Sequence, residues 1–251
     1  MTTARRRATA ALAFLSLTAA CYEVPAGEQR TKEVVNDLVA REYGTASSRY
    51  RMFEAEILSP EAAPAWRRVI DHADATVREW AVDALSRIDM EDDLTLVQAR
   101  LDDPVRGVRT AAVSGLIRMD RQAATAELAR RLTLAAPEQV TLAAAGLVEL
   151  GYTEGAALIV QRFTDPSLPE STRAALTQPL AALGGAVVIV PLVEAALDTE
   201  ASVELRRLAA ESAFAAEAPG MEDELRRLLG ADDDYVRALA ETMLGRVGQA
   251  G

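Results

Sequence analysis

The chain has 251 residues, half of them hydrophobic, and a formal net charge of −11 with one histidine and one cysteine. That hydrophobic content excludes disorder, because it supplies enough apolar surface to bury a core. The acidic charge excludes a nucleic-acid-binding surface, which has to be basic to meet phosphates. A lone cysteine cannot form a disulfide within the chain, so we expect side-chain packing to stabilise the fold.

The first 20 residues have the order of a secretory signal. A basic stretch, MTTARRR, precedes an apolar run at 8–20 that is too short to span a bilayer as a mature helix. The run ends at Cys21, and Leu17-Thr18-Ala19-Ala20-Cys21 resembles a bacterial lipobox. The match departs from that motif at Thr18, because the lipobox prefers leucine three residues before the cysteine.

The lipobox resemblance implies that Cys21 is lipidated, is the first residue of the mature protein and attaches it to a membrane. We therefore expect a lipid-anchored protein of the bacterial cell envelope. The periplasmic face of the outer membrane is favoured, because Tyr22 and not an aspartate follows the cysteine. The alternative is an ordinary secretory signal, residues 1–20, that is cleaved nearby and leaves Cys21 free or removes it.

The next segments predict a tether and a cap. Residues 21–30 contain Pro25 and Gly27 and no apolar period, which predicts a tether behind the lipid anchor. Helical spacing begins at Thr31, and a second short helix is predicted over 47–58. Residues 31–59 therefore predict an N-terminal helical cap.

Residues 60–251 repeat with a period of about 32 residues. Each repeat has an anchor, an apolar residue that is usually followed by arginine. A small residue usually lies four places after the anchor. A leucine lies seven or eight places after it in five of the six repeats, with Ala213 in the other, and another apolar helix precedes each anchor. This pattern predicts six helical hairpins with the anchors Val77-Arg78, Val108-Arg109, Val140-Thr141, Thr172-Arg173, Leu205-Arg206 and Val236-Arg237.

The spacing within one repeat predicts which residues are buried. Counted from Val77, offsets zero, four, seven, eight and eleven share one face of a helix. Arg78 lies at the edge of this stripe, where we expect it to reach a carboxylate or helix carbonyls of the next repeat. Acids before the anchors, such as Asp74 and Asp103, predict helix N-caps, with Pro104 at a first helical position.

The repeats resemble HEAT repeats. The pattern Asp-x-x-Val-Arg-x-x-Ala-x-x-Ala-Leu is carried best at 74–85 and 102–116, and it is similar to the short variety found in bilin-lyase-type proteins. The resemblance covers 60–247 and implies an all-α fold: an α-solenoid, a right-handed α-α superhelix, that binds other molecules on an extended surface. The run AVVIVPLV at 186–193 looks β-like, but the repeat register and Pro191 favour a helix.

Catalytic and metal-binding constellations are missing from the sequence. His72 alone cannot supply the paired His-Glu motifs of HEAT-like metalloenzymes, nor a Ser-His-Asp triad. Acidic clusters at 89–93, 222–224 and 232–234 lack the alternating spacing and glycine of a calcium loop. We therefore predict no enzyme, no cofactor and no metal site. The edge positions Arg78, Arg109, Arg173, Arg206 and Arg237 are candidate structural residues.

Apolar side chains at offsets five and nine suggest a binding surface, because these offsets point away from the predicted stripe. The candidate groove residues are Val113, Ile117, Val148 and Phe214. The competing interpretation is contact between neighbouring second helices. The third repeat is one residue short, so its register is open: counting back from Leu147 places Ala144 at offset five, whereas counting forward from Val140 buries it.

These features predict a non-catalytic lipoprotein scaffold that binds a protein partner, with no nucleic acid. The alternative is a bilin-lyase-like or other small-molecule-handling HEAT protein.

Overall fold

The computed structural model describes residues 24–134, 136–216, 218 and 222–247. These residues divide into two compact units, with the division after Ile88. No strand occurs among the described residues, and every regular element is a helix. The prediction of an all-α fold built from HEAT-like helical hairpins is confirmed.

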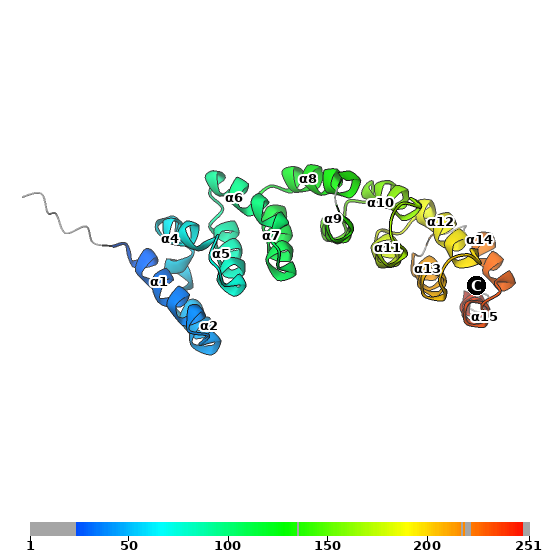
Figure 1. The fold of residues 1–251 in the computed structure, drawn as a ribbon, viewed down its shortest axis with the longest axis horizontal. Helices are drawn as coiled ribbons and strands as arrows, with labels where there is room; N and C mark the ends of the chain where they lie inside the picture. The colour runs from blue at the N-terminus through cyan, green and yellow to red at the C-terminus, as the bar shows by residue number, and fades with distance from the viewer. Residues whose placement is uncertain (1–23, 135, 217, 219–221, 248–251) are drawn as a thin grey trace, which may run out of the picture. The chain divides into compact units, whose positions relative to one another are not determined.

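The first unit contains the N-terminal helices and the first hairpin (Figure 1). Its core includes Trp66, which is fully buried and whose indole Nε1 donates a 3.0 Å hydrogen bond to the carbonyl of Ile57. The rings of Tyr50 and Trp80 meet edge to face with centroids 5.2 Å apart. The elements are α1 (Ala26–Val39), α2 (Tyr43–Met52), α3 (Glu54–Ile57), a 3-10 turn (Pro60–Ala62), α4 (Ala63–Val69) and α5 (Ala75–Ile88).

The predicted boundary between tether and cap at residue 30 is wrong, because α1 already begins at Ala26. Pro25 is the residue just before the helix, where a missing N–H costs nothing. Gly27 does not break the helix but allows a close approach: a Cβ there would lie 2.3 Å from the carbonyl oxygen of Glu56. The helix predicted over 47–58 is two helices, α2 and α3, which are separated at Phe53.

The second unit contains five further hairpins, in which the first helices form one layer and the second helices form another (Figure 1). Helix α12 confirms that residues 186–193 are helical. The elements are a 3-10 turn (Glu91–Asp93), α6 (Leu94–Ala99), a 3-10 turn (Arg100–Asp102), α7 (Arg106–Met119), α8 (Arg121–Leu134), α9 (Pro137–Glu149), α10 (Gly155–Phe163), α11 (Glu170–Leu183), α12 (Ala186–Leu197), α13 (Val203–Ala215), α14 (Glu222–Arg226), a 3-10 turn (Arg227–Gly230) and α15 (Asp234–Val247).

The buried positions of α9 settle the register of the short third repeat. In α7 the buried residues after the anchor are Ala112, Val113, Gly115 and Leu116. The same pattern recurs in α9, 31 residues later, as Ala143, Ala144, Gly146 and Leu147. Counting back from Leu147 is therefore the correct register.

Offset five is buried, contrary to the prediction that it faces solvent. Val82, Val113, Thr177 and Ala210 are each at most 3% exposed. Gly146 shows the reason, because a Cβ on this glycine would lie 2.8 Å from Cγ1 of Val113. Within the second unit, α7 is thus covered by the next second helix, α9, as well as by its own hairpin. In α15 this offset holds Glu241, which is exposed.

The acids before the anchors accept backbone hydrogen bonds, as predicted. Oδ1 of Asp74 accepts from the N–H of Thr76 at 2.8 Å, and Oδ1 of Asp103 accepts from the N–H of Val105 at 2.9 Å. The prediction for Pro104 is wrong, because α7 begins at Arg106 and Pro104 lies in the preceding turn.

Candidate functional site

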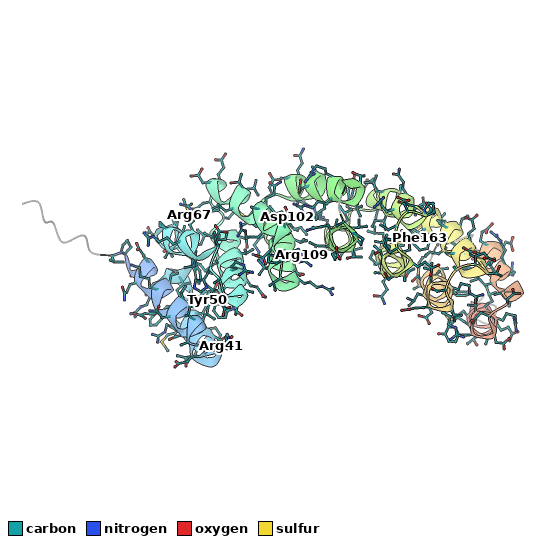
Figure 2. The ribbon with its side chains drawn as sticks, viewed as in Figure 1. Arg41, Tyr50, Arg67, Asp102, Arg109 and Phe163 are labelled. Atoms are coloured by element: carbon teal, nitrogen blue, oxygen red, sulfur yellow. The ribbon has the colours of Figure 1, made fainter. Side chains whose placement is uncertain are left out.

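Four of the five edge arginines, Arg78, Arg109, Arg173 and Arg237, donate hydrogen bonds to carbonyls of their own hairpins, where the sequence predicted contacts with the next repeat. Arg109 lies on α7 (labelled in Figure 2), and its Nη1 donates to the carbonyls of Asp103 at 2.8 Å and Pro104 at 3.0 Å. Arg78 makes the same two bonds in the first hairpin, to carbonyls five and six residues upstream. These carbonyls lie in the turns between helices, where no helical N–H is available to them, so a guanidinium from the first turn of the following helix satisfies them.

The remaining edge arginines follow this pattern only in part. Nε of Arg173 donates to the carbonyl of Phe163 at 2.8 Å, and its guanidinium lies 5.7 Å from the centroid of that ring. Arg237 donates to the carbonyl of Ala231. Arg206 differs, because its guanidinium makes no hydrogen bond to a carbonyl among the described residues; its Nε, like that of Arg109, is buried without a hydrogen-bond partner. These contacts make the edge arginines parts of the hairpin turns.

A groove of about 480 Å³ runs across three consecutive second helices of the second unit, α7, α9 and α11. Each helix contributes one strip of side chains. The lining residues are Arg106, Arg109, Thr110 and Val113 of α7; Glu138, Thr141, Leu142, Ala145, Gly146 and Glu149 of α9; and Ala175, Gln178 and Pro179 of α11.

Helix α9 lies between α7 and α11 and supplies the middle of the groove lining. It packs less extensively against α7 than against α11. At Gly146 the side chain of Val113 from α7 packs directly against the backbone of α9. Val113, Leu142 and Ala145 supply apolar side chains to the lining from α7 and α9, and these three residues are called the floor of the groove below.

A network of side chains holds the third hairpin against the second. Arg131 of α8 is buried, and its guanidinium makes two bonds to Asp102, at 2.6 and 2.9 Å. Gln139 at the start of α9 accepts from Arg131 at 3.1 Å and donates to the carbonyl of Leu101 at 3.0 Å. These bonds join the turn between α6 and α7 to both helices of the next hairpin, α8 and α9. They therefore help to fix the position of α9, which contributes to the groove.

The Arg131 network also perturbs its carboxyl groups. Hydrogen bonds from Arg131 lower the pKa of Asp102. Hydrogen bonds from Arg130 and then Arg131 lower the pKa of Glu127, against the opposing effect of burial. Both carboxyl groups are therefore held in the charged form that pairs with arginine.

Some charged side chains that line the groove have hydrogen-bond partners within the described part of the chain, and others have none there. Arg109 is held by the turn carbonyls, and Glu149 Oε2 accepts from Ser114 Oγ at 3.3 Å. Arg106 and Glu138 are exposed and make no side-chain hydrogen bond or ion pair with any other described residue. These two opposite charges are available to a bound molecule.

Only one of the four groove residues predicted from the sequence lines this groove. Val113 lines the groove, but only 3% of its surface is exposed. Ile117, Val148 and Phe214 are partly exposed and lie outside the lining. Sequence reasoning missed offsets two and six, which supply Thr110, Thr141, Ala145 and Gln178 when α9 is counted in its correct register.

The structure shows no metal centre within its described ranges: no group of three His, Cys, Asp or Glu side chains there could hold a metal ion. His72 lies in the turn between α4 and α5, where its Nδ1 accepts from the N–H of Asp74 at 3.0 Å. None of the described helices has the length and apolarity needed to cross a membrane. Cys21 and the predicted signal at 1–20 lie outside the described residues.

Comparison with known proteins supports the repeat assignment. Residues 52–117, which include the first hairpin and most of the second, match the family model for HEAT repeats. No curated protein shows significant similarity to the chain. The later hairpins continue the same architecture beyond the matched segment.

Proposed function

We propose that this chain is a non-catalytic scaffold that binds a protein partner, because residues 52–117 match HEAT repeats and further helical hairpins follow them in the chain. The observation that carries the proposal is the groove across α7, α9 and α11. It combines an apolar floor with unpaired charges, the mixture that protein-binding surfaces use.

The geometry of the groove favours a macromolecular partner. Its lining comes from three successive repeats, so a bound chain could contact all three helices at once. Leu142 and Ala145 offer apolar contact, while Arg106 and Glu138 offer charges of both signs. Apolar contact supplies most of the affinity, and paired charges mainly select the partner and its orientation.

We further propose that the scaffold is a lipoprotein of the bacterial cell envelope, attached to the membrane through Cys21. The support is the order of the first 21 residues, in which a basic stretch and a short apolar run end at the only cysteine. The periplasmic face of the outer membrane is the preferred location, since Tyr22 follows the cysteine. A lipid anchor would present the groove to partners at the membrane surface.

The test is capture of a partner from envelope extracts with the intact protein and two leucine variants. Leu142 is partly exposed on the groove floor, and Leu229 is 42% exposed outside the groove. We expect Leu142→Arg to abolish capture, because it replaces an apolar side chain of the floor by a larger charged one and lies four residues after Glu138, close enough to occupy that charge. We expect Leu229→Arg to leave capture intact. Equal capture by the two variants would refute the groove assignment. A co-purifying small molecule displaced by Leu142→Arg would support the small-molecule alternative instead.

A further inference from the structure

One wall of the groove contains a proline inside a helix. Pro179 lies within α11, and proline has no N–H to give to the carbonyl four residues earlier. That carbonyl belongs to Ala175, which therefore lacks its helical hydrogen-bond donor. Residues four apart lie on the same helix face, and both Ala175 and Pro179 line the groove. The free acceptor is therefore presented along the groove wall.

The neighbouring groups suit a peptide backbone. Gln178, next to Pro179, lines the same wall with an exposed amide that can both donate and accept. Arg106 on α7 and Glu138 on α9 add one unpaired charge of each sign. The groove thus offers a backbone acceptor, an amide and two charges around an apolar floor.

We propose that the groove binds an extended peptide segment, which donates a backbone N–H to the Ala175 carbonyl and pairs an acidic side chain with Arg106 and a basic one with Glu138. This inference rests on the proposed scaffold function and specifies its partner. An extended segment fits because its backbone N–H groups are free, whereas a helix uses its own internally. The unpaired charges of both signs call for complementary charges on the segment.

The chain provides a matched control for the proline. Pro191 also lies within a helix, α12, and does not line the groove. Replacing either proline by alanine restores a backbone N–H and removes a residue that disfavours helix interiors. Only Pro179→Ala returns a donor to a carbonyl in the groove. The two variants therefore share the effect on helix stability and differ in the effect on binding.

The probe is a phage-displayed library of random 12-residue peptides selected on the full chain, followed by fluorescence anisotropy with the enriched peptides. We expect enriched sequences to share one acidic and one basic position. Pro179→Ala should weaken their binding about two- to tenfold, the value of one hydrogen bond, and Pro191→Ala should leave it unchanged. Arg106→Glu should weaken binding, and a charge-reversed peptide should recover it.

An amide-to-ester scan of the best peptide separates a lost hydrogen bond from a change in helix shape. At one position, replacing the peptide's amide by an ester should weaken its binding to the wild type about two- to tenfold. The same ester should not weaken its binding to Pro179→Ala any further, because both changes remove the same hydrogen bond. Ester effects that persist in Pro179→Ala would overturn the role of the Ala175 carbonyl.

Failure of this inference is distinguishable from failure of the proposed function. If Leu142→Arg abolishes peptide binding but Pro179→Ala does not weaken it, the groove stands and the backbone contact is refuted. If peptides bind equally to Leu142→Arg and wild type, both proposals fail. If no sequence is enriched, or only amphipathic helical sequences are, the extended-peptide inference is refuted, while capture sensitive to Leu142→Arg would still support the scaffold.

Discussion

Arg109 and Leu116 show how differently two residues of one helix contribute to stability. Leu116 is 2% exposed in the core of α7, whereas Arg109 is partly exposed and bonds to the preceding turn. Burial of a large apolar side chain removes it from water entirely, while a hydrogen bond to a turn replaces one to water.

We expect Leu116→Ala to lower the free energy of unfolding by about 2–5 kcal/mol, because it leaves a cavity. Arg109→Ala should lower it by about 1 kcal/mol through the loss of bonds to the turn carbonyls. Urea melts of both variants measure the two losses. A larger loss for Arg109→Ala would mean that the turn, not the core, limits the stability of this hairpin.

Sequence periodicity was sufficient to predict the helices of the repeats but not the width of their buried face. The offsets from Val77 identify the side that packs within a hairpin. They cannot show that Val113 is covered by Gly146, because that contact comes from the neighbouring repeat. Gly27 was misread for the same reason, since its close approach to Glu56 is tertiary.

The groove was predictable only in kind. Apolar and small residues on the outer face of the second helices indicated a surface for a partner. Of the four residues chosen from offsets five and nine, only Val113 lines this groove, and it is almost fully buried. Pro179 could have been noticed as a proline in a predicted helix, which leaves the carbonyl of Ala175 free. That this carbonyl lies beside a groove follows from the packing of α11 against α9. The sequence of α11 alone does not give that packing.

Among the helical hairpins, the third is joined to the second through side-chain charges. Arg131 of α8 is buried and bonds to Asp102, and Glu127 accepts from its Nε at 2.7 Å. Each carboxyl group has a folded-state pKa below its ordinary value, which is 3.8 for Asp102 and 4.5 for Glu127. Their contribution to stability is therefore complete above about pH 4.5 and is lost as the pH falls through the lower folded-state pKa values.

We expect the wild type to lose stability progressively as the pH falls below about 4.5. In Arg131→Met the loss across that range should be smaller, because Asp102 and Glu127 no longer gain from pairing with this guanidinium. Thermal melts from pH 7 to pH 3 test this. Arg226→Met is the control, since Arg226 pairs with an exposed carboxylate of Asp223. Identical pH profiles for wild type and Arg131→Met would show that the network does not couple to protonation.

For the chain as a whole, the proposed function combines a binding groove with a membrane anchor. Replacing Cys21 by serine removes the only thiol that a lipid could be attached to. We expect Cys21→Ser to appear in the soluble periplasmic fraction or to remain unprocessed, because a cleaved or lipid-free chain has lost its anchor. Fractionation and the mass of the mature N-terminus measure this. Wild-type processing together with membrane association would refute the lipoprotein assignment.

The binding of a protein partner along α9 is tested most directly by a photo-crosslinking residue placed at single positions in the living host cell. Ala145 is exposed in the groove, and Ala126 is an exposed alanine on α8 outside the groove lining. We expect light to produce a discrete protein adduct from position 145, no adduct from position 126, and loss of the adduct when Leu142→Arg is added. Adducts of equal yield from both positions, or an adduct from position 126 alone, would contradict the account.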